Sequence, residues 1–177
     1  MAPPVDLVGI RHMQLLIACM EETNDSSISS QRSSLLEWIV QVIKHTLDAP
    51  KTIVRGHLLE FLQRSPSITC DPKLTTFLVD SLQDANVQRQ VQVLQFISEL
   101  SIDKPPNTLI SSVISRLDDV NPEVRQIAYS ALGHIGEKAP TNEVISKLVS
   151  ALGDQSAEVR WSACSALGHI GEKAATN

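Results

Sequence analysis

Residues 124–138 read VRQIAYSALGHIGEK and residues 159–173 read VRWSACSALGHIGEK, so the second stretch repeats the first 35 positions later. Aligning residues 107–142 with residues 142–177 gives 22 identities in 36 positions. A fixed period of about 20–50 residues is typical of stacked-repeat proteins, in which each unit packs against its neighbours. The sequence therefore predicts a repeat architecture.

Each copy carries two apolar stripes at helical spacing, which predicts a pair of amphipathic helices. The first stripe is Ile110, Val113, Ile114 and Leu117, repeated as Ile145, Leu148, Val149 and Leu152. The second is Val124, Ala128, Ala131, Leu132 and Ile135, repeated as Val159, Ala163, Ala166, Leu167 and Ile170. The small alanines should let neighbouring helices approach closely. Gly136 and Gly171 follow the stripes, where glycine commonly caps a helix. Such a hairpin cannot bury both faces alone and must stack on other copies.

The same phase extends towards the N-terminus, because Leu47, Leu82, Leu117 and Leu152 are each 35 residues apart. We predict one solenoid domain over residues 1–177. Its expected parts are a helix at 5–21, a Ser-rich loop at 22–32, and repeats at 33–64, 72–100, 107–138 and 142–175. Asn177 falls where a further copy would begin, so we expect a longer array or end-to-end association through the last repeat.

The pattern D-x4-VR-x2-A-x2-ALG-x-IG, from Asp119 to Gly136 and again from Asp154 to Gly171, resembles HEAT-type repeats. It is most similar to the short HEAT-like subclass that is found in phycobilin lyases. This resemblance implies an all-α, right-handed solenoid of antiparallel hairpins. It also implies a ladder of turn aspartates and second-helix arginines, formed by Asp119, Arg125, Asp154 and Arg160. Repeat 2 has Arg89-Gln90 in place of VR, so we expect the ladder in the last two repeats alone.

Composition argues against several partners and compartments. The formal net charge is −5 and aromatic residues make up 3%, which disfavours binding to nucleic acid. Three cysteines without CxxC spacing indicate a reducing compartment, so we predict a cytoplasmic protein. Arg11 and His12 interrupt the N-terminal apolar stretch, which is too short to span a membrane.

No catalytic arrangement is recognisable, and we predict neither an enzyme nor a cofactor or metal site. The similar deoxyhypusine hydroxylases bind iron with His-Glu pairs, whereas no histidine here precedes a glutamate. His134 and His169 recur with the repeat, but neighbouring helices lie about 10 Å apart, too far to share one ion. An enzyme or enzyme subunit of the bilin-lyase or hydroxylase kind, and a purely structural spacer, are the alternatives.

The favoured function is a scaffold that binds a protein or peptide on the concave surface of the second helices. In designed relatives the variable positions lie just after VR and just before ALG. Carried over, they are Trp161, Ser162 and Ser165 in repeat 4; Gln126, Ile127 and Ser130 in repeat 3; Val91, Gln92 and Gln95 in repeat 2; and His57 and Glu60 in repeat 1. Trp161 and Ile127 are the strongest candidates, because both are large and apolar at positions expected to face outwards. Packing of Trp161 against a neighbouring repeat is the alternative.

Overall fold

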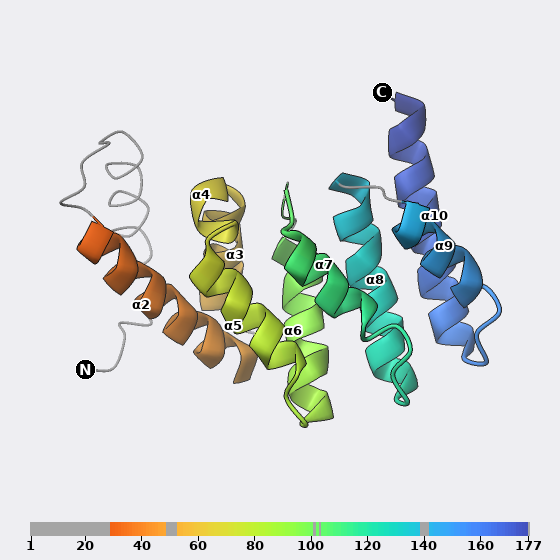
Figure 1. The fold of residues 1–177 in the computed structure, drawn as a ribbon, viewed down its shortest axis with the longest axis horizontal. Coiled ribbons are helices and arrows are strands. Elements are labelled where there is room, and N and C mark those ends of the chain that lie inside the picture. Colours follow the sequence, from red (N-terminus) through yellow and green to blue (C-terminus); the bar gives the residue numbers. More distant parts are fainter. Residues whose placement is uncertain (1–28, 49–52, 101, 103, 139–141, 177) are drawn as a thin grey trace. The chain divides into compact units, whose positions relative to one another are not determined.

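The computed structural model describes residues 29–48, 53–100, 102, 104–138 and 142–176. The secondary structure of these residues is α-helical, with no strand among them, as predicted (Figure 1). The predicted helix at 5–21 lies outside the described residues. Contacts divide the chain into one compact unit that ends at Leu74 and another that begins at Thr75.

The first unit contains α2 (Ser29–Asp48), α3 (Ile53–Gln63), the single turn α4 (Pro66–Thr69) and the start of α5 (Pro72–Leu82). Helix α2 begins at Ser29, so the predicted loop at 22–32 ends earlier than expected. Arg32, in the first turn of α2, is fixed by contacts with residues further along the chain. Its guanidinium donates to the carbonyl of Ser67 at 2.9 Å and to the carboxylate of Asp71 at 3.3 Å.

The second unit contains the rest of α5, α6 (Val87–Leu100), α7 (Asn107–Ile114), α8 (Pro122–Lys138), α9 (Asn142–Ala151) and α10 (Ala157–Thr176). These helices form consecutive hairpins, and the second helices pack in the order α6, α8, α10. This arrangement is an all-α, solenoid-like stack. The division of the whole chain into one solenoid domain stays a prediction.

The core of the second unit follows the two predicted stripes. Val113, Leu117, Val124, Ala128 and Leu132 are all at most 1% exposed. Three of their counterparts in the last repeat, Leu148, Val159 and Ala163, are also fully buried. Burial of such side chains provides the main driving force for stacking the hairpins.

The predicted glycine caps were wrong. Helix α8 continues past Gly136 to Lys138, and α10 continues past Gly171 to Thr176. A glycine inside a helix costs only about 1 kcal/mol relative to alanine, which neighbouring helical residues and packing can offset.

Candidate functional site

Three turns of the second unit share one local design, D-x-N or D-x-S, before a second helix. In each turn the Asp Oδ1 accepts a hydrogen bond from the backbone N–H two residues on. The pairs are Asp84 with Asn86 at 2.9 Å, Asp119 with Asn121 at 2.9 Å, and Asp154 with Ser156 at 2.8 Å. This Asx turn fixes the entry of the chain into the helix.

The third residue of each turn caps the helix that follows. Asn121 Oδ1 accepts from the backbone N–H of Glu123 at 2.9 Å, and Asn86 Oδ1 accepts from that of Gln88 at 2.9 Å. Ser156 Oγ accepts from the N–H of Val159 at 3.4 Å and donates to Glu158 at 2.7 Å. That last bond lowers the pKa of Glu158. Asn and Ser are among the best N-cap residues, so the turn chemistry starts α6, α8 and α10.

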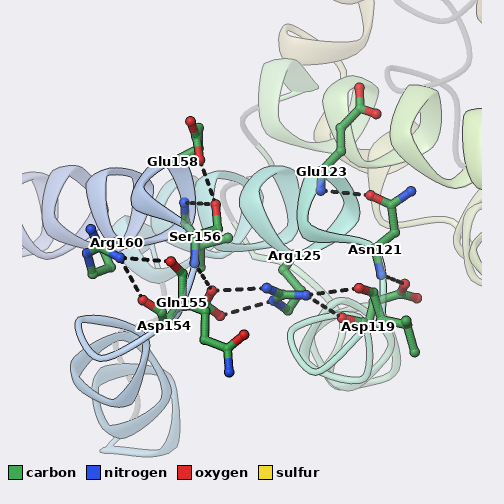
Figure 2. A network of polar contacts seen from close by, with 11 residues as sticks. Asp119, Asn121, Glu123, Arg125, Asp154, Gln155, Ser156, Glu158 and Arg160 are labelled. Carbon is green, nitrogen blue, oxygen red and sulfur yellow. Dashed lines mark hydrogen bonds and ion pairs between the residues drawn. The ribbon is translucent and has the colours of Figure 1, made fainter.

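Arg125 joins repeat 3 to repeat 4 (Figure 2). One end of its guanidinium, Nη1, donates to the carbonyls of Asp119 at 2.9 Å and Val120 at 3.2 Å, both in its own repeat. The other edge, Nε and Nη2, donates to the two carboxylate oxygens of Asp154, each at 3.0 Å. A bidentate arginine–carboxylate pair is strong and fixes geometry, so it sets the register of the two repeats.

The surroundings of this pair favour its charged form. The side chains of Arg125 and Asp154 are 17% and 16% exposed, which limits screening by solvent. The hydrogen bonds that Arg125 donates to the Asp154 carboxylate lower the pKa of Asp154 and raise the pKa of Arg125. Burial, with the charges of Asp118 and Asp154, raises the pKa of the nearby Tyr129 phenol.

The predicted ladder has only this one rung between repeats in the described chain. Arg160 repeats the intra-repeat half, since its Nη1 donates to the carbonyls of Asp154 at 2.8 Å and Gln155 at 3.1 Å. Gln90, the counterpart of Arg125 in repeat 2, donates from Nε2 to the carbonyl of Asp84 at 2.7 Å. The Gln90 amide therefore makes the contact with the turn carbonyl that an arginine makes in repeats 3 and 4. The Asp119 carboxylate lies 3.7 Å from the guanidinium of Arg116 in its own repeat.

Helices α8 and α10 approach closely at Gly133, as the small residues predicted. A methyl group placed on Gly133 would lie 2.5 Å from Cβ of Ala166. The contact therefore requires glycine at this position. The equivalent Gly168 in α10 has no atom within 4 Å of such a methyl group.

The same close approach corrects the spacing expected for the histidines. The rings of His134 and His169 lie 5.9 Å apart between centroids and are tilted by 34°. The separation of about 10 Å expected for the two imidazoles was too long, because helix spacing does not set the distance between side chains that project from helices in close contact at Gly133 and Ala166. Within the described residues, no group of three or more His, Cys, Asp or Glu side chains could hold a metal ion.

The predicted partner-binding residues differ widely in exposure. Trp161 near the start of α10 is 71% exposed, so it does not pack into a neighbouring repeat in the described chain. The half-buried candidates are Ile127, Gln126, Ser130, Ser165, Gln92, Gln95 and His57. Glu60 is exposed and forms an ion pair with Arg64 at 2.9 Å, while His57 lies 3.9 Å away. These last two candidates belong to the first unit and the others to the second.

Two of the candidates were placed wrongly. Val91 is 1% and Ser162 4% exposed, so neither side chain lies on the surface. Ser162 stands three residues after Val159 and four before Ala166, which puts it on the buried stripe of α10. Helix α6 buries residues around most of its circumference, Val91 and Val93 included. Helical spacing from the core residues would have revealed the error at Ser162.

Comparison with known proteins agrees with this architecture. Residues 110–177 match the family model of HEAT repeats, so this part of the chain consists of HEAT repeats. A crystal structure of an engineered protein is similar to this chain at a TM-score of 0.51 and 16% identity. The match covers 96% of this chain and 82% of that one, and it shows the fold alone. No curated protein matches. None of the described helices is long and apolar enough to cross a membrane.

Proposed function

We propose that this repeat scaffold binds a protein or peptide along its second helices α8 and α10, with Trp161 as the main contact. The observation that supports it is the 71% exposure of Trp161. The second tryptophan of the chain, Trp38, is half-buried in the first unit. An indole left in water has no role in the core, and tryptophan is enriched among the residues that dominate binding energy.

The helices beneath Trp161 are held in a fixed arrangement before any partner arrives. The Arg125–Asp154 pair joins the two repeats at their turns, and Gly133 seats against Ala166 further along α8 and α10. A preformed surface loses little conformational entropy on binding, which favours affinity. Ile127, half-buried on α8, adds apolar area to the same layer of helices.

The test is capture of a partner on the immobilised chain, with variants taken from the repeats themselves. Trp161→Gln introduces the residue of repeat 3 at the same position, and Ile127→Ser introduces that of repeat 4. Val120→Gln is the control, because Val120 is 96% exposed in a turn outside the proposed surface. Circular dichroism should show equal helicity for all variants.

We expect a protein that wild type and Val120→Gln retain and that Trp161→Gln loses, with affinity for the purified partner reduced roughly tenfold or more. With Trp38→Phe, Trp161 is the only tryptophan, and its emission should shift to shorter wavelength when that partner binds. Equal retention by wild type and Trp161→Gln would overturn the proposal, as would an unchanged emission spectrum.

A further inference from the structure

The outer face of the last repeat is the same surface that repeat 3 presents to repeat 4. Several positions carry the same residue in repeats 3 and 4. At such positions a difference in exposed fraction reports whether another repeat covers the side chain. Ile110 is 8% and Leu117 1% exposed, whereas their counterparts Ile145 and Leu152 are 37% and 43% exposed. Leu132 is fully buried, but Leu167 is only half-buried.

The glycines of the two repeats differ in exposure in the same way, and Val149 of α9 is exposed as well. Gly133 is buried against Ala166, while Gly168 is exposed with open space beside it. Val149 is 53% exposed and extends the stripe of Ile145 and Leu152 along α9. We call the surface formed by Ile145, Val149, Leu152, Leu167 and Gly168 the outer face.

Arg160 lies at the turn of repeat 4, where its guanidinium is held by the same kind of carbonyl contacts as that of Arg125 in repeat 3. Its Nη1 is held by the carbonyls of Asp154 and Gln155, as Nη1 of Arg125 is held by those of Asp119 and Val120 (Figure 2). The remaining edge of the Arg125 guanidinium binds a carboxylate of the next repeat. No described carboxylate forms an ion pair with Arg160, so its equivalent edge is open to an anionic group.

We propose that the outer face docks a further HEAT-type hairpin, one that carries an aspartate in its interhelical turn and a small residue opposite Gly168. The turn carboxylate would bind the open edge of Arg160, as Asp154 binds Arg125. Charge selects this occupant, because the open edge of Arg160 complements a turn carboxylate, and Arg125 binds the carboxylate of Asp154 through the equivalent edge. Trp161 stands seven residues before Gly168, on the same side of α10, so the outer face borders the Trp161 surface. The inference itself does not rest on the proposed function.

The experiment supplies such a hairpin in tethered form. Residues 143–177 are added again after Asn177, in phase with the repeat, with the added tryptophan and cysteine changed to the Gln and Tyr of repeat 3. The tether gives a high effective concentration. Cys164 reports docking, since it is exposed while its counterpart Tyr129 is 4% exposed beneath repeat 4. Maleimide labelling of Cys164 is followed by peptide mass spectrometry.

We expect labelling of Cys164 to slow roughly tenfold or more when the hairpin is added, a change that corresponds to about 1.4 kcal/mol. Arg160→Gln, or Asn in place of the added aspartate, should each restore much of the rate. Val120→Gln should not restore it. An unchanged rate would overturn the proposal, and so would protection that survives both charge variants.

Competence of the added hairpin is checked separately by letting it replace residues 143–177, where it should be helical and bind repeat 3. If the hairpin folds in that position but does not slow the labelling of Cys164 on the extended chain, the result contradicts the inference. Sedimentation of the unextended chain tests self-association. A dimer that Val149→Glu dissociates would assign the outer face to a second copy and likewise contradict it.

Discussion

At the scale of single residues, the 35-residue period places chemically similar groups in equivalent but not identical settings. Arg125, Arg160 and Gln90 all bind the turn carbonyl of their own repeat, yet only Arg125 also binds a described carboxylate. The chain therefore provides its own control. Replacing Arg125 by glutamine removes a contact between repeats, whereas the same replacement at Arg160 removes no such contact within the described chain.

Replacing Arg125 by glutamine should destabilise the second unit by about 1–3 kcal/mol, the usual range for a lost hydrogen bond to a charged group. The variant keeps the carbonyl contact that Gln90 makes and loses the pair with Asp154. Arg160→Gln makes the same chemical change without a described carboxylate partner and should cost much less. Urea unfolding followed by circular dichroism measures both. Equal losses would show that the pair contributes nothing beyond the turn contact.

The Arg125–Asp154 pair should also make stability depend on pH in the acid range. The hydrogen bond from Arg125 lowers the pKa of Asp154 in the folded state relative to the unfolded state. Its stabilisation is therefore complete above the unfolded pKa, about 4, and is lost as pH falls through the lower folded pKa. The gap in unfolding free energy between wild type and Asp154→Asn should be widest at neutral pH, should narrow as pH falls below the unfolded pKa, and should close once pH is below the lowered folded pKa of Asp154. A constant gap would contradict this linkage.

At the scale of elements, helix packing depends on side-chain size at the contact between α8 and α10. The motif ALG occurs in both helices, but only Gly133 meets a neighbour, Cβ of Ala166. Gly168 faces open space in the described chain. The same residue in the same motif thus permits close approach in one helix and serves no such contact in the other.

Gly133→Ala should destabilise the protein by about 1–3 kcal/mol, because the added methyl group overpacks the interface. Gly168→Ala should instead stabilise it by about 0.5–1 kcal/mol, through the higher helix propensity of alanine. Thermal unfolding of the two variants side by side tests the opposite signs. Shifts of the same sign would mean that α8 and α10 do not meet at Gly133.

At the scale of the whole molecule, the chain comprises two compact units, each with its own buried core. Within the second unit, stability should spread along the stack, since each hairpin interacts mainly with its neighbours. Helix α8 packs against α6 on one side and α10 on the other, while α10 packs against α8 and α9. The stack should therefore be most stable at its middle.

Hydrogen exchange should show this gradient directly. Backbone amides of α8 should exchange more slowly than those of α10, because α10 can open without disturbing α6. Arg125→Gln should speed exchange in α10 more than in α6, since it removes the contact that fixes repeat 4. Exchange measured by mass spectrometry at several times resolves both effects. Uniform protection from α6 to α10 would indicate that the second unit unfolds as one block.

The sequence by itself determined the helical hairpins, their period and the residues that stack them. Two copies with 22 identities in 36 positions reveal which positions are apolar, and an apolar stripe at spacing 3 and 4 can only be buried on one side of a helix. The D-x-N and D-x-S turns were present in the sequence as well, and their capping is a local property of neighbouring residues. The family resemblance predicted a ladder of turn aspartates and second-helix arginines, of which the structure shows one rung between repeats, Arg125 with Asp154.

Only the tertiary structure decided which of the equivalent positions are covered. Leu132 and Leu167 have the same place in the repeat, yet Leu132 is fully buried and Leu167 is half-buried. Ile110 and Ile145 have the same side chain and the same place in the repeat, but differ in exposure because one has a neighbour above it. Exposure depends on what packs against a helix, and the helix's own residues do not specify that. The surfaces available for binding follow from this stacking.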